Sequence, residues 1–414
     1  MTSGIHKPIV LGEATVFIGP ATTFKPKTAV VSMIDPANRI YLDWNATAPI
    51  APGAREAAVE ALCAGGNASS VHAEGRAARA MVETVRRTLA DRFAVPADGV
   101  VFTSGGTEAN ATALAPRVTK GGVCAERLVV SSIEHPAVLS GGRFASDEIS
   151  TIGVDEDGRI KLDALERNLA EDRTPALISV MAANNETGVI QPLSDIAAMA
   201  ENAGAIFHTD AVQAFGRVDD GMLEADLITV SGHKIGAPMG VGALIRRPGV
   251  SVPPLIRGGG QERGARGGTE NVAAVAGLGA ALASPAANPA AWEETAAARD
   301  AFEESLKAAL TGVVIFGERA PRLANTSLFS ASKTPADLAL IGLDLAGVSL
   351  SSGAACSSGK IGPSHVLAAM GVAPQTARAA LRVSVGPEGA GDSLQRFLVA
   401  FTQTLVAMER HSIP

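Results

Sequence analysis

Between Gly99 and Arg246 the chain alternates short apolar runs with segments of helical periodicity, and this alternation limits the fold more than any other feature. The apolar runs are rich in β-branched residues and predict seven strands, near residues 100–103, 127–132, 149–152, 176–181, 205–209, 226–230 and 241–245. Helices between successive strands indicate crossover connections, so we expect a mainly parallel sheet covered on both faces. The sequence therefore predicts an α/β fold.

A lysine and a carboxylate follow two of these strands at the same edge of the expected sheet. Lys234 ends the run Ser231-Gly232-His233-Lys234, and Asp210 follows the strand before it. Ligands bind at the carboxyl ends of parallel strands, where a partly desolvated lysine can attack a carbonyl. Pyridoxal phosphate needs both groups, because a lysine holds its aldehyde and a carboxylate keeps its ring nitrogen protonated. Taken alone, the pair is also compatible with a solvated lysine at a strand end.

A tight glycine turn joins the first of these strands to a helical segment. The turn is Gly105-Gly106-Thr107. Glycines let the backbone approach an anion closely, and the first amides of a helix donate hydrogen bonds to it. The Thr107 hydroxyl adds another donor, so the turn predicts a phosphate cradle. The alternative is an ordinary helix start that Ser104 or Thr107 caps.

Three further polar side chains occupy positions suited to such a cofactor or its substrate. His135 lies at a strand tip, where it can stack on a pyridine ring or move protons. Asn185, also at a strand tip, is placed to donate to the ring hydroxyl and to the substrate. Arg382, in a final strand at 381–385, offers the planar fork that grips an amino-acid carboxylate, with a buried salt bridge as the alternative role.

One of the three cysteines, Cys356, lies in a loop of small residues that follows a predicted strand at 348–351. It has nothing apolar to pack against, so reactivity explains this thiol better than burial. Cys63 and Cys124 lie far away and form no CxxC pair, which argues against a disulfide framework and a structural zinc site. We expect both to be inert, buried thiols.

Four motifs in this order resemble those of the cysteine desulfurases. These pyridoxal-phosphate enzymes of the class V aminotransferase group supply sulfur for iron-sulfur clusters. The motifs are Asn184-Asn185-Glu186-Thr187-Gly188, Asp210-Ala211-Val212-Gln213, Ser231-Gly232-His233-Lys234 and Ser351-Ser352-Gly353-Ala354-Ala355-Cys356. The resemblance runs from about Tyr41 to about Gly386, and the long Cys356 loop matches the first desulfurase group, the NifS and IscS type. Ala48 departs from the family, which has threonine there.

The resemblance implies a fold-type I architecture with pyridoxal 5'-phosphate as the cofactor. Residues 1–38 are expected to form an irregular leader, residues 39–283 a large domain whose N-terminal segment packs on the small domain, and residues 284–414 that smaller α+β domain. Asn45 is expected at the substrate. Further cofactor contacts are implied for Gln213, Ser231, Gly232, His233 and, across a homodimer interface, Thr269.

The resemblance also implies a reaction. L-cysteine displaces Lys234 from the cofactor, Lys234 or His135 removes the Cα proton, and the Cys356 thiolate attacks the substrate sulfur. The products are L-alanine and a persulfide on Cys356, whose sulfur passes to an acceptor such as an iron-sulfur scaffold protein. No structural metal is expected, and Cys356 would at most be a transient iron-sulfur ligand through its persulfide.

Two other readings are compatible with parts of this pattern. A selenocysteine lyase or another class V aminotransferase would use the same cofactor residues without needing a persulfide-carrying thiol. A non-catalytic sulfur or iron-sulfur carrier would use Cys356 without turnover. The cysteine in its small-residue loop favours the desulfurase over the first, and the full set of cofactor residues favours it over the second.

Composition argues against several other classes of protein. A formal net charge of -7 without Lys/Arg-rich runs disfavours nucleic acid or an anionic membrane as the partner. No stretch approaches eighteen consecutive apolar residues, so no transmembrane helix is expected. The balance of 47% hydrophobic and 19% charged residues is typical of a soluble globular enzyme, and dispersed cysteines fit a reducing cytoplasm.

Overall fold

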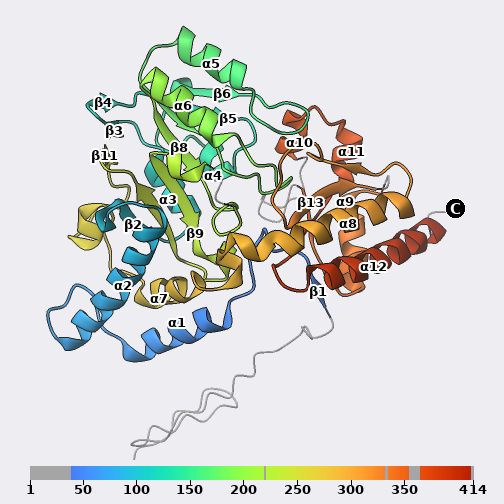
Figure 1. Cartoon of the computed structure of the whole chain (residues 1–414), viewed down its shortest axis with the longest axis horizontal. Coiled ribbons are helices and arrows are strands. Elements are labelled where there is room, and N and C mark those ends of the chain that lie inside the picture. The colour runs from blue at the N-terminus through green and yellow to red at the C-terminus, as the bar shows by residue number, and fades with distance from the viewer. Residues whose placement is uncertain (1–38, 219–220, 332–333, 354–363, 412–414) are drawn as a thin grey trace, which may run out of the picture. The chain divides into compact units, whose positions relative to one another are not determined.

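The computed structural model describes residues 39–218, 221–331, 334–353 and 364–411 (Figure 1). The predicted leader at 1–38 and the predicted nucleophile Cys356 lie outside these residues.

The large sheet has seven strands, which confirms the predicted fold class, and each strand lies within two residues of its predicted bounds. Its strand order is β2-β10-β9-β8-β7-β5-β6. β10 runs antiparallel to both neighbours, and the other pairings are parallel. The strands are β2 (Val100–Thr103), β5 (Arg127–Ser131), β6 (Ile149–Ile152), β7 (Ala176–Ser179), β8 (Ile206–Asp210), β9 (Leu227–Ser231) and β10 (Gly242–Arg246).

Both faces of this sheet are buried, because successive side chains of a strand point to opposite sides. Leu177, Ile206 and Leu227 pack in one core, with α3 (Gly106–Ala113) and α4 (Pro136–Leu139). The next residue of each strand packs in the opposite core. The helices of that core are α1 (Pro52–Ala64), α2 (Ala73–Arg92), α5 (Leu162–Glu171), α6 (Leu193–Ala203) and α7 (Val272–Ala281).

A second, antiparallel sheet has a core of its own, in which the rings of Phe302, Phe329, Phe397 and Phe401 contact one another. Its strand order is β12 (Val314–Ile315), β13 (Thr326–Ser330), β16 (Leu381–Ser384) and β15 (Ser351–Ser352). The helices of this core are α8 (Glu293–Ala309), α9 (Ala336–Leu345) and α12 (Ala390–His411).

The predicted strand at 348–351 is wrong as one element. Its first half is β14 (Val348–Ser349), which pairs with β1 (Ile40–Tyr41), and its second half begins β15 in the other sheet. The shorter elements are β3 (Thr119–Lys120), β4 (Val123–Cys124), β11 (Val250–Ser251), α10 (His365–Ala369) and α11 (Pro374–Arg378).

The described residues from Ile40 onward form one compact unit, and the division predicted at residue 284 stays a prediction. Among the described helices, none has both the length and the apolar character needed to cross a membrane.

Candidate functional site

A cavity of about 300 Å³ lies at the carboxyl ends of the parallel strands, where an α/β sheet is expected to bind a ligand. Five predicted residues line it, which are Lys234, Asp210, His135, Asn185 and Arg382. Six more predicted residues share its wall, namely Asn45, Gly106, Thr107, Gln213, Ser231 and His233. The volume is that of a small-molecule site.

Lys234 lies in a short helical turn, Gly232–Ile235, directly after β9. Its Nζ donates to the carbonyl oxygens of Asn45, at 2.5 Å, and Ala46, at 2.8 Å. A Cβ on Gly232 would lie 2.9 Å from the Cβ of Ala237, so only glycine permits this turn. Gly232 therefore shapes the turn but does not line the cavity.

Asp210 is buried at the end of β8, and its hydrogen-bond partners are neutral. Oδ2 accepts from Asn110 Nδ2 at 2.6 Å, and Oδ1 accepts from the Val212 amide at 2.9 Å. Burial raises the pKa of Asp210 despite these two bonds. A cationic N–H in the cavity would therefore be the partner that this carboxylate lacks.

His135 is the N-cap of α4, and its Nδ1 accepts from the Ala137 amide at 3.1 Å. The neutral ring therefore carries its proton on Nε2. Burial lowers the pKa of His135, so the ring is neutral at pH 7. Burial likewise lowers the pKa of His233 to about 4, and His233 Nδ1 lies 3.1 Å from Thr47 Oγ1.

The predicted phosphate cradle starts α3 without a side-chain cap. Gly105 is the N-cap, and no side chain accepts from the first amides, which excludes the capped start by Ser104 or Thr107. A Cβ on Gly106 would lie 2.7 Å from Val212 Cγ2, so this close approach requires glycine. The first amides of a helix have no acceptor within the helix, and Gly106 and Thr107 bring them to the cavity wall.

Arg382 forms the buried salt bridge that was one of its two predicted roles, and its role as a carboxylate clamp stays a prediction. Nη2 donates to Asp43 Oδ1 at 2.7 Å in a buried ion pair, and Nη1 donates to the Asn185 carbonyl at 2.9 Å. The side chain also lines the cavity, and its Nε is buried without a hydrogen-bond partner. The guanidinium thus has donor capacity left for a ligand carboxylate.

Asn45 joins both sheets through a fully engaged side-chain amide. Oδ1 accepts from Arg217 and Asn325, and Nδ2 donates to the Asn185 carbonyl and to Thr326 Oγ1. Its carbonyl oxygen also accepts from Lys234 Nζ. This geometry favours a role in positioning other groups over direct substrate contact through the side chain.

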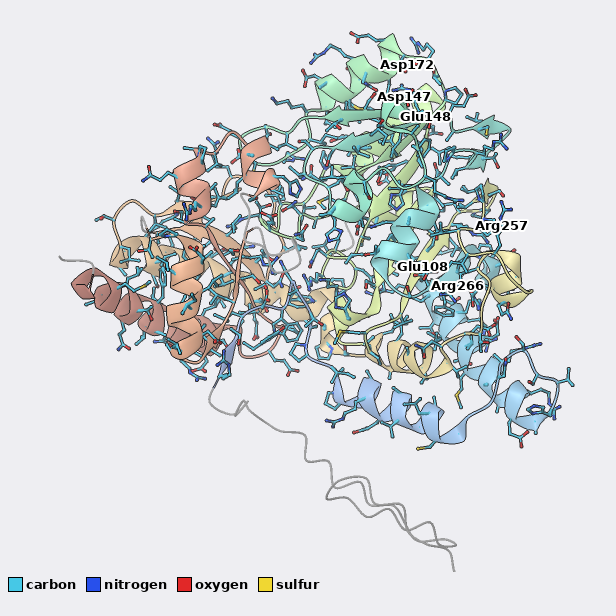
Figure 2. The ribbon with its side chains drawn as sticks, turned by 180° about the vertical axis from the view of Figure 1, so that it is seen from behind. Glu108, Asp147, Glu148, Asp172, Arg257 and Arg266 are labelled. Atoms are coloured by element: carbon cyan, nitrogen blue, oxygen red, sulfur yellow. The ribbon has the colours of Figure 1, made fainter. Side chains whose placement is uncertain are left out.

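Thr269 is exposed and lies outside the cavity wall. Thr269 ends a glycine-rich loop, residues 258–269, and lines a separate pocket of about 170 Å³. Arg266 of this loop and Glu108 of α3 lie side by side in Figure 2, with their ion pair at 2.9 Å. The pair connects the loop to α3, the helix that begins at the predicted phosphate cradle.

The same loop has a second, more deeply buried anchor. Glu262 accepts two hydrogen bonds from Arg86, at 2.7 and 2.8 Å, and one from the Phe102 amide at 2.9 Å. Glu262 and Arg263 have φ angles of 47° and 55°, which non-glycine residues rarely adopt. Such backbone strain persists only where the surrounding contacts hold it, as these do.

Three buried charged residues near the site had no role predicted from the sequence. Arg217 contacts Asn45 and Gln213, and Glu134 accepts from Ser131 Oγ and the Met181 amide. Burial raises the pKa of Glu134 to about 8. The one feature of the sequence that could have drawn attention to Arg217 is its position, a single charged residue in a largely apolar stretch and four residues after Gln213.

The third of these residues, Glu186, lies between the two ends of the segment that contains Cys356. Its Oε2 accepts from Ser364 Oγ at 2.5 Å and would lie 3.1 Å from a Cβ on Gly353. Burial raises the pKa of Glu186 to about 7. The Cys356 segment therefore leaves and rejoins the described structure beside Asn185.

The expectation of two buried thiols elsewhere is wrong for Cys63, which is exposed, while Cys124 is half-buried. The residues of α1 that are buried are Ala54 and Ala61, and α1 packs against α7. Cys63 follows Ala61 by two positions, which places it on the far side of the helix.

Most of the chain is similar to proteins of one known family. The family model described as aminotransferase class-V matches residues 40–397. A cysteine desulfurase of Gluconacetobacter diazotrophicus is 41% identical over 372 residues, which cover 87% of this chain and 92% of that protein. An IscS-like cysteine desulfurase of Mycobacterium tuberculosis is 38% identical over 364 residues, covering 84% and 91%. The crystal structure of a NifS-like protein from Rickettsia africae matches with a TM-score of 0.79 and 34% identity, over 89% of this chain and 99% of that one.

Proposed function

The chain belongs to the class V aminotransferase family and, within it, to the cysteine desulfurases, and we propose that it removes sulfur from L-cysteine to give L-alanine. The observation that carries the proposal is the meeting of Lys234, Asp210, His135 and Arg382 around one cavity. Family membership makes it a pyridoxal-phosphate enzyme.

The residues present fit pyridoxal phosphate. Asp210 is a buried carboxylate whose hydrogen-bond partners are neutral, so it would hold a protonated ring nitrogen as its cationic partner. The uncapped start of α3 at Gly106 and Thr107 suits a phosphate, and Lys234 offers its amine to an aldehyde. When bound, the cofactor supplies the electron sink for the substrate Cα.

The protein's own groups orient the substrate and move protons. We assign Arg382 to the substrate carboxylate and Lys234 Nζ to removal of the Cα proton, with His135 Nε2 as the second group able to carry it. Asp210 keeps a proton on the ring nitrogen. Gln213 and Asn185 line the cavity and are assigned to the ring oxygen and to the substrate.

The sulfur step is assigned to the Cys356 thiolate. It attacks the substrate sulfur, the Cβ–S bond breaks, and the carbon fragment takes up a proton to become L-alanine. Cys356 is left as a persulfide, so the atoms of one cysteine are accounted for without an external oxidant. Ser351 of β15 pairs with Arg382, which brings the start of this segment to the substrate clamp.

The wider setting is also a proposal. We assign the persulfide sulfur to an acceptor such as an iron-sulfur scaffold protein, and we propose a reducing cytoplasm as the compartment. Because Thr269 lies away from the cavity of its own chain, we propose that a homodimer brings it to the partner's cofactor.

The deciding experiment incubates the purified protein, loaded with pyridoxal phosphate, with L-cysteine and a thiol reductant. We expect alanine and sulfide in equal amounts, without any need for a keto acid. Amino transfer that depends on a keto acid would make the protein an aminotransferase. Alanine from L-selenocysteine but not from L-cysteine would make it a selenocysteine lyase. If neither substrate were turned over, the protein would instead be a non-catalytic sulfur or iron-sulfur carrier.

A further inference from the structure

Arg217 is a buried cation whose hydrogen-bond partners within the described part of the chain are all neutral. Its Nη1 donates to Asn45 Oδ1 and to Gln213 Oε1, both at 2.8 Å, and its Nη2 lies 3.4 Å from the Lys234 carbonyl. The guanidinium lies over the ring of Trp292, 5.5 Å from its centroid. One side chain thus touches three residues of the candidate site without lining the cavity itself.

An unpaired guanidinium is costly to bury, so its place calls for a reason beyond packing. Arginine has donors only, and therefore the amide atom that faces it must be an oxygen. On the opposite side, Gln213 Nε2 donates to the Asn45 carbonyl at 2.9 Å. The arginine thus draws the oxygen of the Gln213 amide away from the cavity, while the NH2 group keeps one hydrogen for a ligand.

We propose that Arg217 is a positioning residue that fixes which end of the Gln213 amide faces the cavity, so that Gln213 presents an N–H to the cofactor's ring oxygen. The same contact holds the Asn45 side chain, whose backbone carbonyl accepts from Lys234 Nζ. The inference rests on the proposed function, because it takes pyridoxal phosphate as the ligand.

Without Arg217 the amide oxygens of Asn45 and Gln213 would each lose a buried donor. A buried acceptor without a partner is unfavourable, so the Gln213 amide is expected to rotate in search of one, and its oxygen can then face the ring oxygen. Two acceptors would repel each other, and cofactor binding should weaken. Both contacts come from a single nitrogen, so a lysine at this position can reproduce them.

The test is a double-mutant cycle on the affinity of the apoprotein for pyridoxal phosphate, followed by absorbance titration. Arg217→Met should weaken cofactor affinity by roughly tenfold or more, the cost of one mispaired buried hydrogen bond. Arg217→Lys should stay within about threefold of wild type, and Arg217→Gln, which has fewer donors, should fall between them. In the Gln213→Leu background, Arg217→Met should change the affinity by less than about twofold, because the amide it orients is gone.

Arg127→Met is the matched control, since Arg127 is also buried but binds Asn168 and the Asp172 carbonyl, outside the cavity wall. It should lower thermal stability without changing cofactor affinity. If Arg217→Met is too unstable to purify, Arg217→Gln takes its place in the cycle.

Three results would overturn the inference. The first is an effect of Arg217→Met, or of Arg217→Gln in its place, that is as large in the Gln213→Leu background as in wild type. The second is an affinity within twofold of wild type for Arg217→Met, and the third is an unchanged affinity for Gln213→Leu alone. The proposed function fails separately, if the wild-type protein binds no pyridoxal phosphate or releases no alanine from L-cysteine.

Discussion

In the glycine-rich loop, Glu262 meets Arg86 in two hydrogen bonds of 2.7 and 2.8 Å. At the cavity, Asp210 in the wall and Arg217, which contacts the wall residues Asn45 and Gln213, have only neutral hydrogen-bond partners among the described residues. All four side chains are buried. Glu262 and Arg86 are counter-charges of each other, whereas neither Asp210 nor Arg217 forms an ion pair within the described residues.

The pKa values of these groups follow the difference. Burial raises the pKa of Asp210 and lowers that of Arg217 to about 9, so both are pushed toward their neutral forms. Burial also acts against the charge of Arg86, but the contacts with Glu262 outweigh it and raise the pKa of Arg86. A buried charge without a counter-charge is typical of a ligand site, whereas a buried ion pair fixes the backbone segments that carry it. Substitutions should therefore remove activity in the cavity and stability in the loop.

The largest expected effect is that of Lys234→Ala. No turnover should remain and no borohydride-reducible bond to the cofactor should form, because the amine that holds the aldehyde is gone. Thermal stability of the apoprotein should be kept. Mass spectrometry after borohydride treatment measures the bond, with Lys120→Ala on β3 as the control that retains it. A reducible bond in the Lys234 variant would place the aldehyde on another lysine.

Cys356→Ser should abolish alanine release from L-cysteine while the cofactor still binds with its wild-type colour. Serine has nearly the same size but is a poor nucleophile toward sulfur. Selenocysteine should still be processed, because selenium leaves more readily. The matched control is Cys63→Ser at the exposed thiol of α1, which should keep full activity. If the Cys356 variant released alanine from L-cysteine at the wild-type rate, the protein would be a lyase or an aminotransferase and not a desulfurase.

Asp210→Asn should lower turnover by about 100-fold or more while the fold and most of the cofactor binding persist. The neutral amide cannot hold the ring nitrogen protonated, and a buried carboxyl with a raised pKa loses little when it becomes neutral. The measurements are steady-state kinetics and apoprotein unfolding. The control is Asp226→Asn, because the Asp226 carboxylate binds Lys120 and the Phe207 amide and does not line the cavity. Turnover within a few-fold of wild type would refute the role of Asp210.

Glu262→Leu tests the other half of the comparison. Removing Glu262 leaves Arg86 with only the half-buried Glu83 as a counter-charge and leaves the Phe102 amide without its acceptor. We therefore expect a loss of about 3 kcal/mol in the free energy of unfolding. The double variant Glu262→Leu with Arg86→Met should recover much of that loss. Denaturant unfolding measures both, with Asp163→Ala at an exposed ion pair as the control without measurable effect. A loss below about 1 kcal/mol would mean that the anchor is no stronger than a surface pair.

The sequence could predict the cavity because most of its residues follow the parallel strands of one sheet. Lys234, Asp210, His135 and Asn185 each lie within a few residues of a strand end, and the edge of the sheet brings them together without further information. The fold required only the periodicity of the apolar runs, and so the strand bounds were predicted closely.

The roles of Arg217 and Asn45 could not be predicted in this way, because they depend on contacts between distant segments. The two side chains are 172 residues apart in the chain, and nothing local in either segment indicates the other. The error at Cys63 has a similar origin, since periodicity alone does not say which face of α1 meets α7. The break between β14 and β15 depends on two different partner strands, which local sequence does not encode.

The smallest expected effect, and the one that most sharpens the comparison, concerns Glu186. Its carboxyl is buried and forms no ion pair with a cation of the described residues, and its folded-state pKa is about 7 against an ordinary value of 4.5. Below pH 4.5 both the folded and the unfolded state hold this proton. Between pH 4.5 and 7 only the folded state holds it, so the contribution of Glu186 to stability falls as the pH rises, by at most about 1.4 kcal/mol per pH unit.

Glu186→Gln should remove this dependence, because glutamine keeps an acceptor for Ser364 Oγ and does not titrate. The measurement is apoprotein unfolding from pH 5 to 8, in which the wild type should become steadily less stable than the variant up to about pH 7. Ser364→Ala is the informative control, since its hydroxyl is the contact that holds the pKa of Glu186 down, and losing it should extend the dependence above pH 7. A constant difference between wild type and Glu186→Gln across this range would mean that Glu186 is charged in the folded protein. It would then need a counter-charge, and the contrast between the paired loop and the unpaired cavity would not extend to the ends of the Cys356 segment.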